Sequence, residues 1–207
     1  MIERLALLSW QSAWPYLLAV FVLSYLLGSI SFGLIFAKLA GAGDIRRIGS
    51  GNIGATNVLR TGKRWAAAAT LICDGAKGYL AVSISGNLGG QAFAVIAGLG
   101  VFLGHLYPVW LGFKGGKGVA TYIGIVLSLS PFIGLLVCAA WIAFAQAFRY
   151  SSLAALMSAV LAPVGFLFFD GTLFALLTFV LVVFIFYSHR ANIVRLFKGE
   201  EPRIGAH

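Results

Sequence analysis

The sequence predicts an all-α integral membrane protein, a seven-transmembrane-helix bundle with its N-terminus outside and its C-terminus in the cytoplasm. Three observations lead to this fold class. Of the 207 residues, 60% are hydrophobic and only 10% are charged, whereas a soluble domain carries about 25% charged residues. Long uncharged stretches recur along the chain, without the alternating polarity of β-barrel strands. Most of the positive charges fall in the segments between those stretches, on one side of the predicted membrane.

Five apolar stretches are long enough for a membrane-spanning helix, which needs about 20 residues. They cover residues 14–38, 65–84, 91–111, 152–169 and 172–189. The uncharged run around the first stretch is longer than the apolar region of a cleaved signal peptide, which has about 7–15 residues. We therefore expect a retained first helix, and a single domain over residues 1–207.

A sixth apolar stretch, residues 119–148, presents a choice between one helix and two. A single helix would be about 45 Å long at about 1.5 Å per residue, against a hydrocarbon core of about 30 Å. Ser130-Pro131 lies near the middle, where a helix breaks readily. The alternatives are one tilted helix, or two short helices over residues 117–130 and 131–148.

The distribution of charge favours two helices here, and therefore seven in total. With seven helices, every Lys and Arg except Arg4 and Lys77 falls on one side of the membrane. With six helices, Arg149 and the basic C-terminal tail would move to the opposite side. Because basic loops stay in the cytoplasm, the first arrangement is favoured.

The formal charge of +9 bears on the partners of the chain. In such an apolar protein we expect anionic membrane lipids or an anionic substrate, and no nucleic acid. Cys73 and Cys138 lie in apolar stretches and are interpreted as small core residues. Metal-ligating residues are too sparse to predict a metal centre, and no cofactor is expected.

The first of three long polar segments covers residues 43–64, and its residues 49–54 match the dinucleotide fingerprint G-x-G-x-x-G. That fingerprint requires a preceding strand, and here a predicted membrane helix precedes it. The glycines still allow close approach of backbone N–H groups to a phosphate. Candidate phosphate-binding side chains are Ser50, Asn52, Thr56, Asn57 and Arg60. The alternative is a flexible cytoplasmic loop whose arginines set the topology.

The second polar segment combines Gly104–Pro108 with Phe113–Gly118. It differs from an ATP-binding P-loop, because Leu111 stands where the first glycine belongs and Gly118 stands where Ser or Thr holds magnesium. Glycines around lysines before a helix nevertheless form a suitable phosphate site. The candidate residues are His105, Lys114, Gly115, Gly116, Lys117 and Gly118. A tight interhelical turn with two orienting lysines is the alternative.

The third polar segment covers residues 189–200. If the preceding helix continues, His189, Asn192 and Arg195 lie along one face. An ordinary basic juxtamembrane tail is the alternative. Within the predicted helices, Asp74 and Lys77 form an intramembrane pair that is either structural or catalytic.

Together these features favour a site for a strongly anionic substrate. Two other classes stay open: a transporter or channel for phosphate or an organic anion, and a non-catalytic membrane scaffold. A transport pathway needs access from both sides, and no matching basic segments face the exterior.

The three polar segments closely resemble the three signature motifs of the bacterial acyl-phosphate:glycerol-3-phosphate acyltransferases. The resemblance rests on Ser50–Asn57 through Arg60, on Gly104–Pro108 with Phe113–Gly118, and on His189–Ile193 through Arg195-Leu196. Further similarity extends to Gly28–Gly33 and Asp74–Gly78, so that it covers the chain in order. One departure is Ser31, where many members have proline.

The resemblance implies a seven-helix enzyme of the bacterial inner membrane, active on the cytoplasmic side without a metal or other cofactor. Its partners would be acyl phosphate from the membrane and glycerol 3-phosphate from the cytoplasm. The products would be lysophosphatidic acid and inorganic phosphate, the first acylation step of phospholipid biosynthesis. We expect a monomer to be the functional unit.

The resemblance also suggests roles for the candidate residues. Catalytic residues would be His189, Asn192, Ser50 and Arg60, with His189 and Asn192 orienting the nucleophile or assisting proton movement. The leaving phosphate is an alternative proton acceptor, and His105 is either a second base or a packed helix-end residue. Substrate-binding residues would be Asn52, Thr56, Asn57, His105, Lys114, Gly115, Gly116, Lys117, Gly118 and Arg195.

Overall fold

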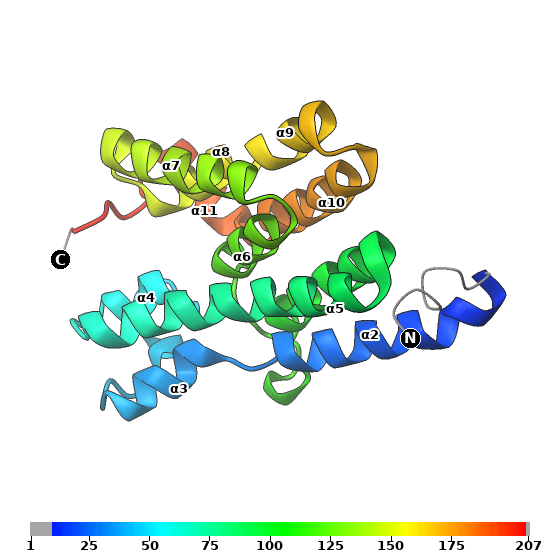
Figure 1. The fold of residues 1–207 in the computed structure, drawn as a ribbon. Coiled ribbons are helices and arrows are strands. Elements are labelled where there is room, and N and C mark those ends of the chain that lie inside the picture. The colour runs from blue at the N-terminus through cyan, green and yellow to red at the C-terminus, as the bar shows by residue number, and fades with distance from the viewer. Residues whose placement is uncertain (1–9, 206–207) are drawn as a thin grey trace.

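The computed structural model describes residues 10–205, and this part of the chain consists of helices and loops without a β-strand. The all-helical prediction is therefore confirmed. In Figure 1, α2 and α5 form a lower layer, α7 to α10 form an upper layer, and α6 lies between them. The helices are α2 (Trp10–Gly28), α3 (Phe32–Leu39), α4 (Ala55–Leu59), α5 (Arg64–Leu106), α6 (Val119–Leu129), α7 (Pro131–Phe148), α8 (Ser151–Ala159), α9 (Leu161–Phe169), α10 (Thr172–Ser188) and α11 (Arg190–Lys198).

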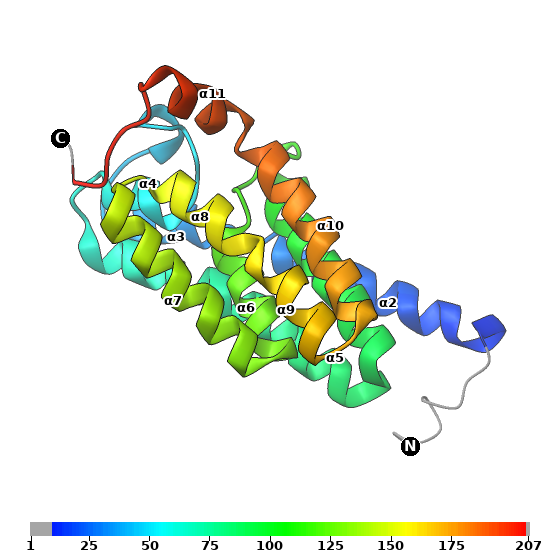
Figure 2. The same ribbon diagram turned by 90° about the horizontal axis from the view of Figure 1, so that it is seen from above.

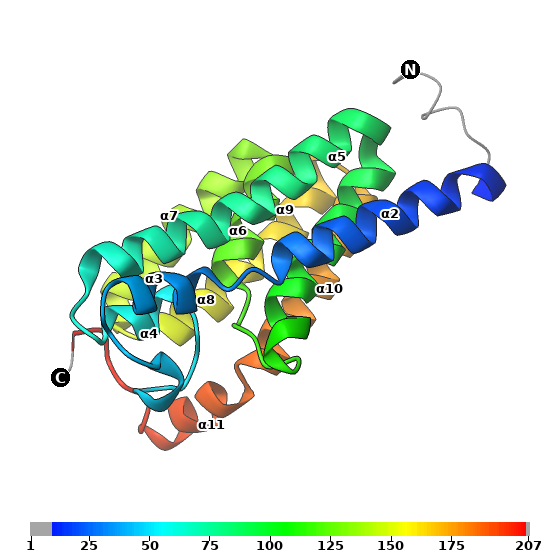
Figure 3. The same cartoon turned by 90° about the horizontal axis from the view of Figure 1, so that it is seen from below.

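One end of the bundle collects the short elements. Figures 1 and 2 place α3, α4, α11 and the C-terminal tail at this end, and the start of α2 at the opposite end. Figure 3 shows the same grouping from below, with the loop between α3 and α4 close to α11. The first and third polar segments of the sequence therefore meet in space.

Helix α5 is a hairpin of two helical arms. Gly89 and Gly90 have non-helical backbone angles, and Gly90 has a φ of +74° that favours glycine. A straight helix would hold Asp74 and His105 about 46 Å apart, at about 1.5 Å per residue. Their side chains instead approach within 3.6 Å. The two arms thus lie side by side and correspond to the helices predicted over residues 65–84 and 91–111, the second of which ends at Leu106.

Three predicted helices are broken or shortened. The helix expected over residues 14–38 is interrupted between Gly28 and Phe32, and that over 152–169 is interrupted at Val160. The helix expected over 117–130 begins at Val119. The break expected at Ser130-Pro131 is present, because α6 ends at Leu129 and Pro131 opens α7, where its missing N–H is tolerated.

Helix α10 does not continue straight into the third polar segment. It ends at Ser188, and α11 departs from it at an angle of 59°. This bend corrects the expectation of one continuous helical face through His189, Asn192 and Arg195. The carbonyl oxygens at the end of α10 bond to the His189 N–H at this corner.

Several described helices have the length and composition of membrane spans. Four meet both criteria within residues 10–205, and five do if α10 and α11 are counted together. That count takes the hairpin α5 as one helix. Large apolar side chains also cover the outer surface, with Leu23, Ile72, Leu135 and Phe168 all more than half exposed. An apolar surface of this extent suits contact with lipid.

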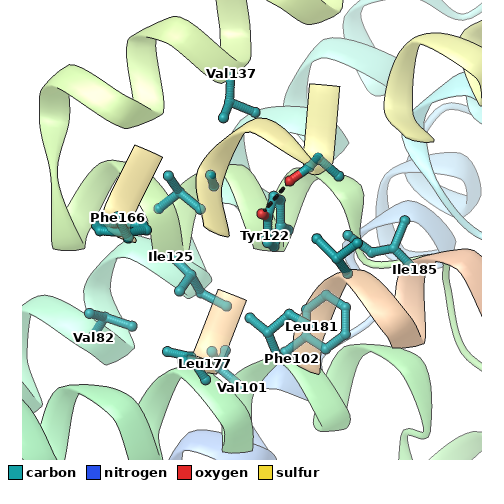
Figure 4. Close-up of a cluster of buried hydrophobic side chains, with 14 of the residues drawn as sticks. Val82, Val101, Phe102, Tyr122, Ile125, Val137, Phe166, Leu177, Leu181 and Ile185 are labelled. Atoms are coloured by element: carbon teal, nitrogen blue, oxygen red, sulfur yellow. Dashed lines mark hydrogen bonds between the residues drawn. The ribbon is translucent and has the colours of Figure 1, made fainter. Parts of the chain in front are cut away.

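The inside of the bundle is an apolar core in which α6 occupies the centre (Figure 4). Tyr122 of α6 is 1% exposed, and its hydroxyl donates a hydrogen bond of 2.7 Å to the carbonyl oxygen of Ala159. Ala159 is the last residue of α8, so this bond lies at the break before α9. A buried hydroxyl without such a partner would be costly.

Glycines set the spacing between helices. A methyl group on Gly28 or Gly104 would overlap the backbone of the facing helix, where α2 packs against the second arm of α5. The same holds where α6 packs against the first arm of α5. There, a methyl group on Gly78 or Gly124 would overlap the backbone of the other helix. Close backbone approach through small residues is a common packing mode of membrane helices.

We expect Gly78→Ala to destabilise the protein, because its methyl group would overlap the Thr121 carbonyl. Overpacking of this kind costs about 1–3 kcal/mol. Gly75→Ala is the matched control on the same arm, since its nearest neighbour would be 3.6 Å away. Thermal unfolding in detergent should show a lowered midpoint for Gly78→Ala alone. Equal midpoints for the two variants would contradict this packing.

Candidate active site

A cavity of about 730 Å³ opens between the first arm of α5, α6, α7 and the end of the bundle that holds α4 and α11. All three polar segments contribute to its wall. The predicted residues that line it are Ser50, Asn52, Thr56, Asn57, Arg60, His105, Lys117, Gly118, His189 and Asn192. Lys114, Gly115, Gly116 and Arg195 do not line it. The structure therefore brings most of the predicted residues around one cavity.

Asn57 shapes the first polar segment from within. Its side-chain amide donates to the Ile45 carbonyl at 2.7 Å, and its oxygen accepts the Ser50 N–H at 3.2 Å. Both polar atoms are thus engaged by the loop, and the side chain is 1% exposed. Asn57 holds Ser50 in place at the cavity wall.

The same segment is tied to α8 across the cavity. The hydroxyl groups of Thr56 and Ser151 lie 3.3 Å apart, and Ser151 and Ser152 both line the cavity. Sequence reasoning missed these serines, because they lie where two predicted helices meet and belong to no recognisable motif. Ser151 is 95 residues away from Thr56 in the chain, so their contact arises from the tertiary structure.

The glycine–lysine loop, residues 112–118, joins the second arm of α5 to α6. The N–H groups of Gly115 and Gly116 donate to the carbonyls of Leu106 and His105 at 2.9 and 3.0 Å. Gly118 caps α6 with a φ of +84°, which excludes most side chains. The loop therefore folds back on α5, leaves Lys114 exposed, and directs Lys117 into the cavity.

Lys117 meets the third polar segment. Its ammonium donates to Asn192 Oδ1 at 2.6 Å. Burial lowers the pKa of Lys117 from 10.5 to about 8, and the positive charges of Arg195 and Arg60 act in the same direction, while Glu201 opposes them. An anion bound next to this ammonium would offset the cost of burying its charge.

His189 lies at the corner between α10 and α11 and is 3% exposed. Its Nδ1 is 2.9 Å from the Ile185 carbonyl oxygen. Because a carbonyl can only accept, Nδ1 must carry the proton of the neutral ring. Nε2 is then the acceptor of the ring, and His189 is one of the residues that line the cavity.

Glu201 organises the third polar segment, and sequence reasoning missed it. Its carboxylate accepts hydrogen bonds from Asn192 at 2.6 Å, Ser152 at 2.7 Å and Arg195 at 2.8 Å. Burial by itself raises the pKa of Glu201, but these bonds outweigh it and leave the pKa below its usual value. One available signal was an acidic residue in a basic tail, six positions after Arg195.

Asn192 is therefore held from two sides, by Lys117 and by Glu201. The chain of contacts runs from the glycine–lysine loop through α11 to the C-terminal tail and α8. Arg195 takes part through Glu201 and not through the cavity wall.

The other side of the cavity is apolar. It is lined by Leu71, Ile72, Leu80, Ile123, Leu127, Cys138, Trp141 and Ile142, from α5, α6 and α7. Leu71, Ile72 and Ile142 are also more than half exposed. A polar end and an apolar side that reaches the outer surface suit an amphiphilic ligand.

Metal binding has little basis in the side chains of this region. Across the described part of the chain, no three His, Cys, Asp or Glu residues gather closely enough to hold a metal ion. The polar groups at the cavity are instead hydroxyls, amides and cations, which suit phosphate oxygens.

The model of the glycerol-3-phosphate acyltransferase family matches residues 18–199. The chain belongs to this family. It is 55% identical to the glycerol-3-phosphate acyltransferase of Mesorhizobium japonicum over 92% of this chain and 97% of the relative. It is 54% identical to the glycerol-3-phosphate acyltransferase of Sinorhizobium medicae, over 95% of this chain and 97% of that relative.

Two solved structures support the assignment. The glycerol 3-phosphate form of PlsY (YgiH), an integral membrane glycerol 3-phosphate acyltransferase, superimposes with a TM-score of 0.88 at 38% identity. The lysophosphatidic acid form superimposes with a TM-score of 0.84 at 36% identity. Each comparison covers 92% of this chain and 96% of the other.

We expect Glu201→Gln to loosen the C-terminal tail, because one amide cannot accept from Asn192, Ser152 and Arg195 together. Leaving a buried polar group unsatisfied costs about 1–3 kcal/mol. The midpoint of thermal unfolding should fall, and trypsin should cut faster after Arg195 or Lys198. Glu200→Gln, at the exposed neighbouring position, is the control. Identical proteolysis of the two variants would show that Glu201 does not hold the tail.

Proposed function

We propose that this protein transfers a fatty acyl group from acyl phosphate to the 1-hydroxyl of sn-glycerol 3-phosphate. The products are lysophosphatidic acid and inorganic phosphate. The observation that carries the proposal is one cavity with a cationic, hydrogen-bonding end and an apolar side that reaches the lipid-facing surface. Membership of the glycerol-3-phosphate acyltransferase family supports it.

We infer a multi-pass protein of the bacterial inner membrane with seven crossings. The two arms of α5, α6, α7, the pair α8–α9 and α10 supply six of them, and α2 with α3 supplies the first. This count puts the N-terminus outside, and puts the cavity and the C-terminus on the cytoplasmic side with most of the basic residues. A monomer suffices, because one chain contributes all three polar segments to the cavity.

Glycerol 3-phosphate binds at Lys117. Lys117 lines the cavity, and its ammonium is the charge on this loop that a phosphate can contact directly. Asn192 holds Lys117, and Arg195 acts through Glu201. Lys114, exposed on the same loop, attracts the substrate anion from the cytoplasm.

The acyl phosphate binds at the first polar segment. Ser50, Asn52 and Thr56 offer neutral hydrogen bonds to its phosphate, and Arg60 offers a charged fork. Asn57 contributes by holding Ser50. The acyl tail extends along the apolar side of the cavity toward the lipid between α5 and α7, so the tail need not leave the membrane.

The reaction needs little covalent help from the protein. The hydroxyl oxygen attacks the acyl carbonyl carbon, an ester bond forms, and the bond from that carbon to the phosphate oxygen breaks. Arg60 neutralises charge on the departing phosphate, and His189 Nε2 accepts a hydrogen bond that orients the hydroxyl. The proton passes to His189 or to the phosphate that leaves.

Purified protein in detergent tests this function. Palmitoyl phosphate and glycerol 3-phosphate should give lysophosphatidic acid and phosphate in equal amounts. Arg60→Ala should lower kcat about 10²–10³-fold, as expected for removal of a preorganised charge-stabilising group. Arg64→Ala, at the exposed start of α5, is the control. Phosphate release without the lipid product, or full activity of Arg60→Ala, would contradict the proposal.

The pH dependence of glycerol 3-phosphate binding follows from Lys117. Since the pKa is lowered to about 8, the ammonium is charged below that pH and loses its charge as the pH rises through it. Phosphate binds the charged form, so KM should be flat near pH 7 and rise up to about tenfold per unit above pH 8.

Lys117→Arg should remove this rise, because a guanidinium stays charged. Lys63→Arg, at the exposed residue before α5, should keep the wild-type profile. Steady-state kinetics between about pH 6.5 and pH 9.5 measure KM for glycerol 3-phosphate in each variant. A rise that persists in Lys117→Arg would assign the titration to another group.

A further inference from the structure

A buried ionic cluster at the cavity wall takes no part in the proposed acyl transfer. It consists of Asp74 and Lys77 on the first arm of α5 and His105 near the end of the second arm. Lys77 Nζ is 2.8 Å from Asp74 Oδ1, and His105 Nδ1 is 3.6 Å from the same oxygen. The three side chains are 3%, 2% and 6% exposed. Asp74 therefore links the two arms of the hairpin.

The break in the first helix supplies hydrogen-bond acceptors for Lys77. Its ammonium donates to the carbonyls of Gly28 and Ile30 at 2.9 and 2.8 Å, and lies 5.7 Å from the centre of the Phe32 ring. These carbonyls lie where α2 ends and α3 has not begun. Removing one partner of a buried ion pair strongly destabilises the folded protein. The cluster therefore connects α2, α3 and both arms of α5.

The cluster also contacts the glycine–lysine loop. The His105 carbonyl accepts the Gly116 N–H at 3.0 Å, and a methyl group on Gly116 would overlap the His105 imidazole at Nε2. The loop thus rests on both the backbone and the ring of His105. The next residue after Gly116 is Lys117, whose ammonium reaches Asn192.

We propose that Asp74, Lys77 and His105 are positioning residues that hold the glycine–lysine loop, so that Lys117 meets the phosphate of glycerol 3-phosphate. The proposal rests on the function proposed above. It assigns His105 to positioning and not to proton transfer. A general base must come within about 2.6–3.2 Å of the reacting hydroxyl. His105 instead turns Nδ1 toward Asp74 and lays Nε2 against Gly116.

The kinetics of His105→Gln separate positioning from base catalysis. Glutamine keeps hydrogen-bonding groups but cannot act as a base. We expect KM for glycerol 3-phosphate to rise about tenfold, with kcat within about threefold and KM for palmitoyl phosphate unchanged. A fall in kcat of about 10²-fold or more at unchanged KM would show base catalysis and overturn the proposal. An inactive wild-type protein would refute the proposed function instead.

A double-mutant cycle tests contact between His105 and the loop. Gly116→Ala should raise KM for glycerol 3-phosphate, because its methyl group meets the imidazole. In a His105→Ala background the ring is gone, so Gly116→Ala should add little. Effects on KM that simply multiply would mean that the ring does not support the loop.

The charged pair is tested with a variant that leaves no unpaired charge. Asp74→Asn with Lys77→Met removes both ions together, a change that folded proteins often tolerate. We expect KM for glycerol 3-phosphate to rise at least about fivefold while the folded fraction, measured by thermal unfolding, is retained. Lys63→Met, at the exposed start of the same helix, is the control. Unchanged KM in a folded double variant would show that the cluster does not position the loop.

Discussion

The buried Lys77 ammonium is the interaction that joins the break in the first helix to the hairpin of α5. A charge with 2% exposure inside a membrane protein must be neutralised and hydrogen-bonded. Asp74 neutralises it, and the carbonyls of Gly28 and Ile30 complete its hydrogen bonds. The broken end of the first helix supplies those carbonyls, and His105 on the second arm of α5 lies 3.6 Å from Asp74. One ammonium thus links the break in the first helix to the hairpin and to the loop that follows it.

A buried charge must be paired at the active-site end of the bundle as well. The cations there repel one another. Burial, together with this repulsion, lowers the pKa of Lys117. Glu201 is the compensating anion, and it reaches Lys117 only through Asn192. Hydrogen bonds occupy both oxygens of the Glu201 carboxylate, which forms its ion pair with Arg195, whereas the Lys117 ammonium bonds to Asn192.

Much of this organisation could be predicted from the sequence. The three polar segments, their meeting at one end and the break at Ser130-Pro131 follow from hydropathy, charge and proline chemistry. The break at Ser29–Ser31 could not be predicted, because Lys77, which bonds the carbonyls at this break, is far away in the chain. Glu201 was missed for a similar reason: its partners come from α8 and α11, and no local pattern marks it. Asn57 and Asn192 had the right location, but their amides hold other residues of the site.

We propose one site formed by the three polar segments, in which Lys117 holds the phosphate of glycerol 3-phosphate. A crystal structure of this protein with glycerol 3-phosphate bound would test this arrangement. We expect a phosphate oxygen within about 3 Å of the Lys117 ammonium, with the 1-hydroxyl turned toward His189 Nε2. A phosphate bound at Arg60 and Ser50, with Lys117 still held only by Asn192, would contradict it.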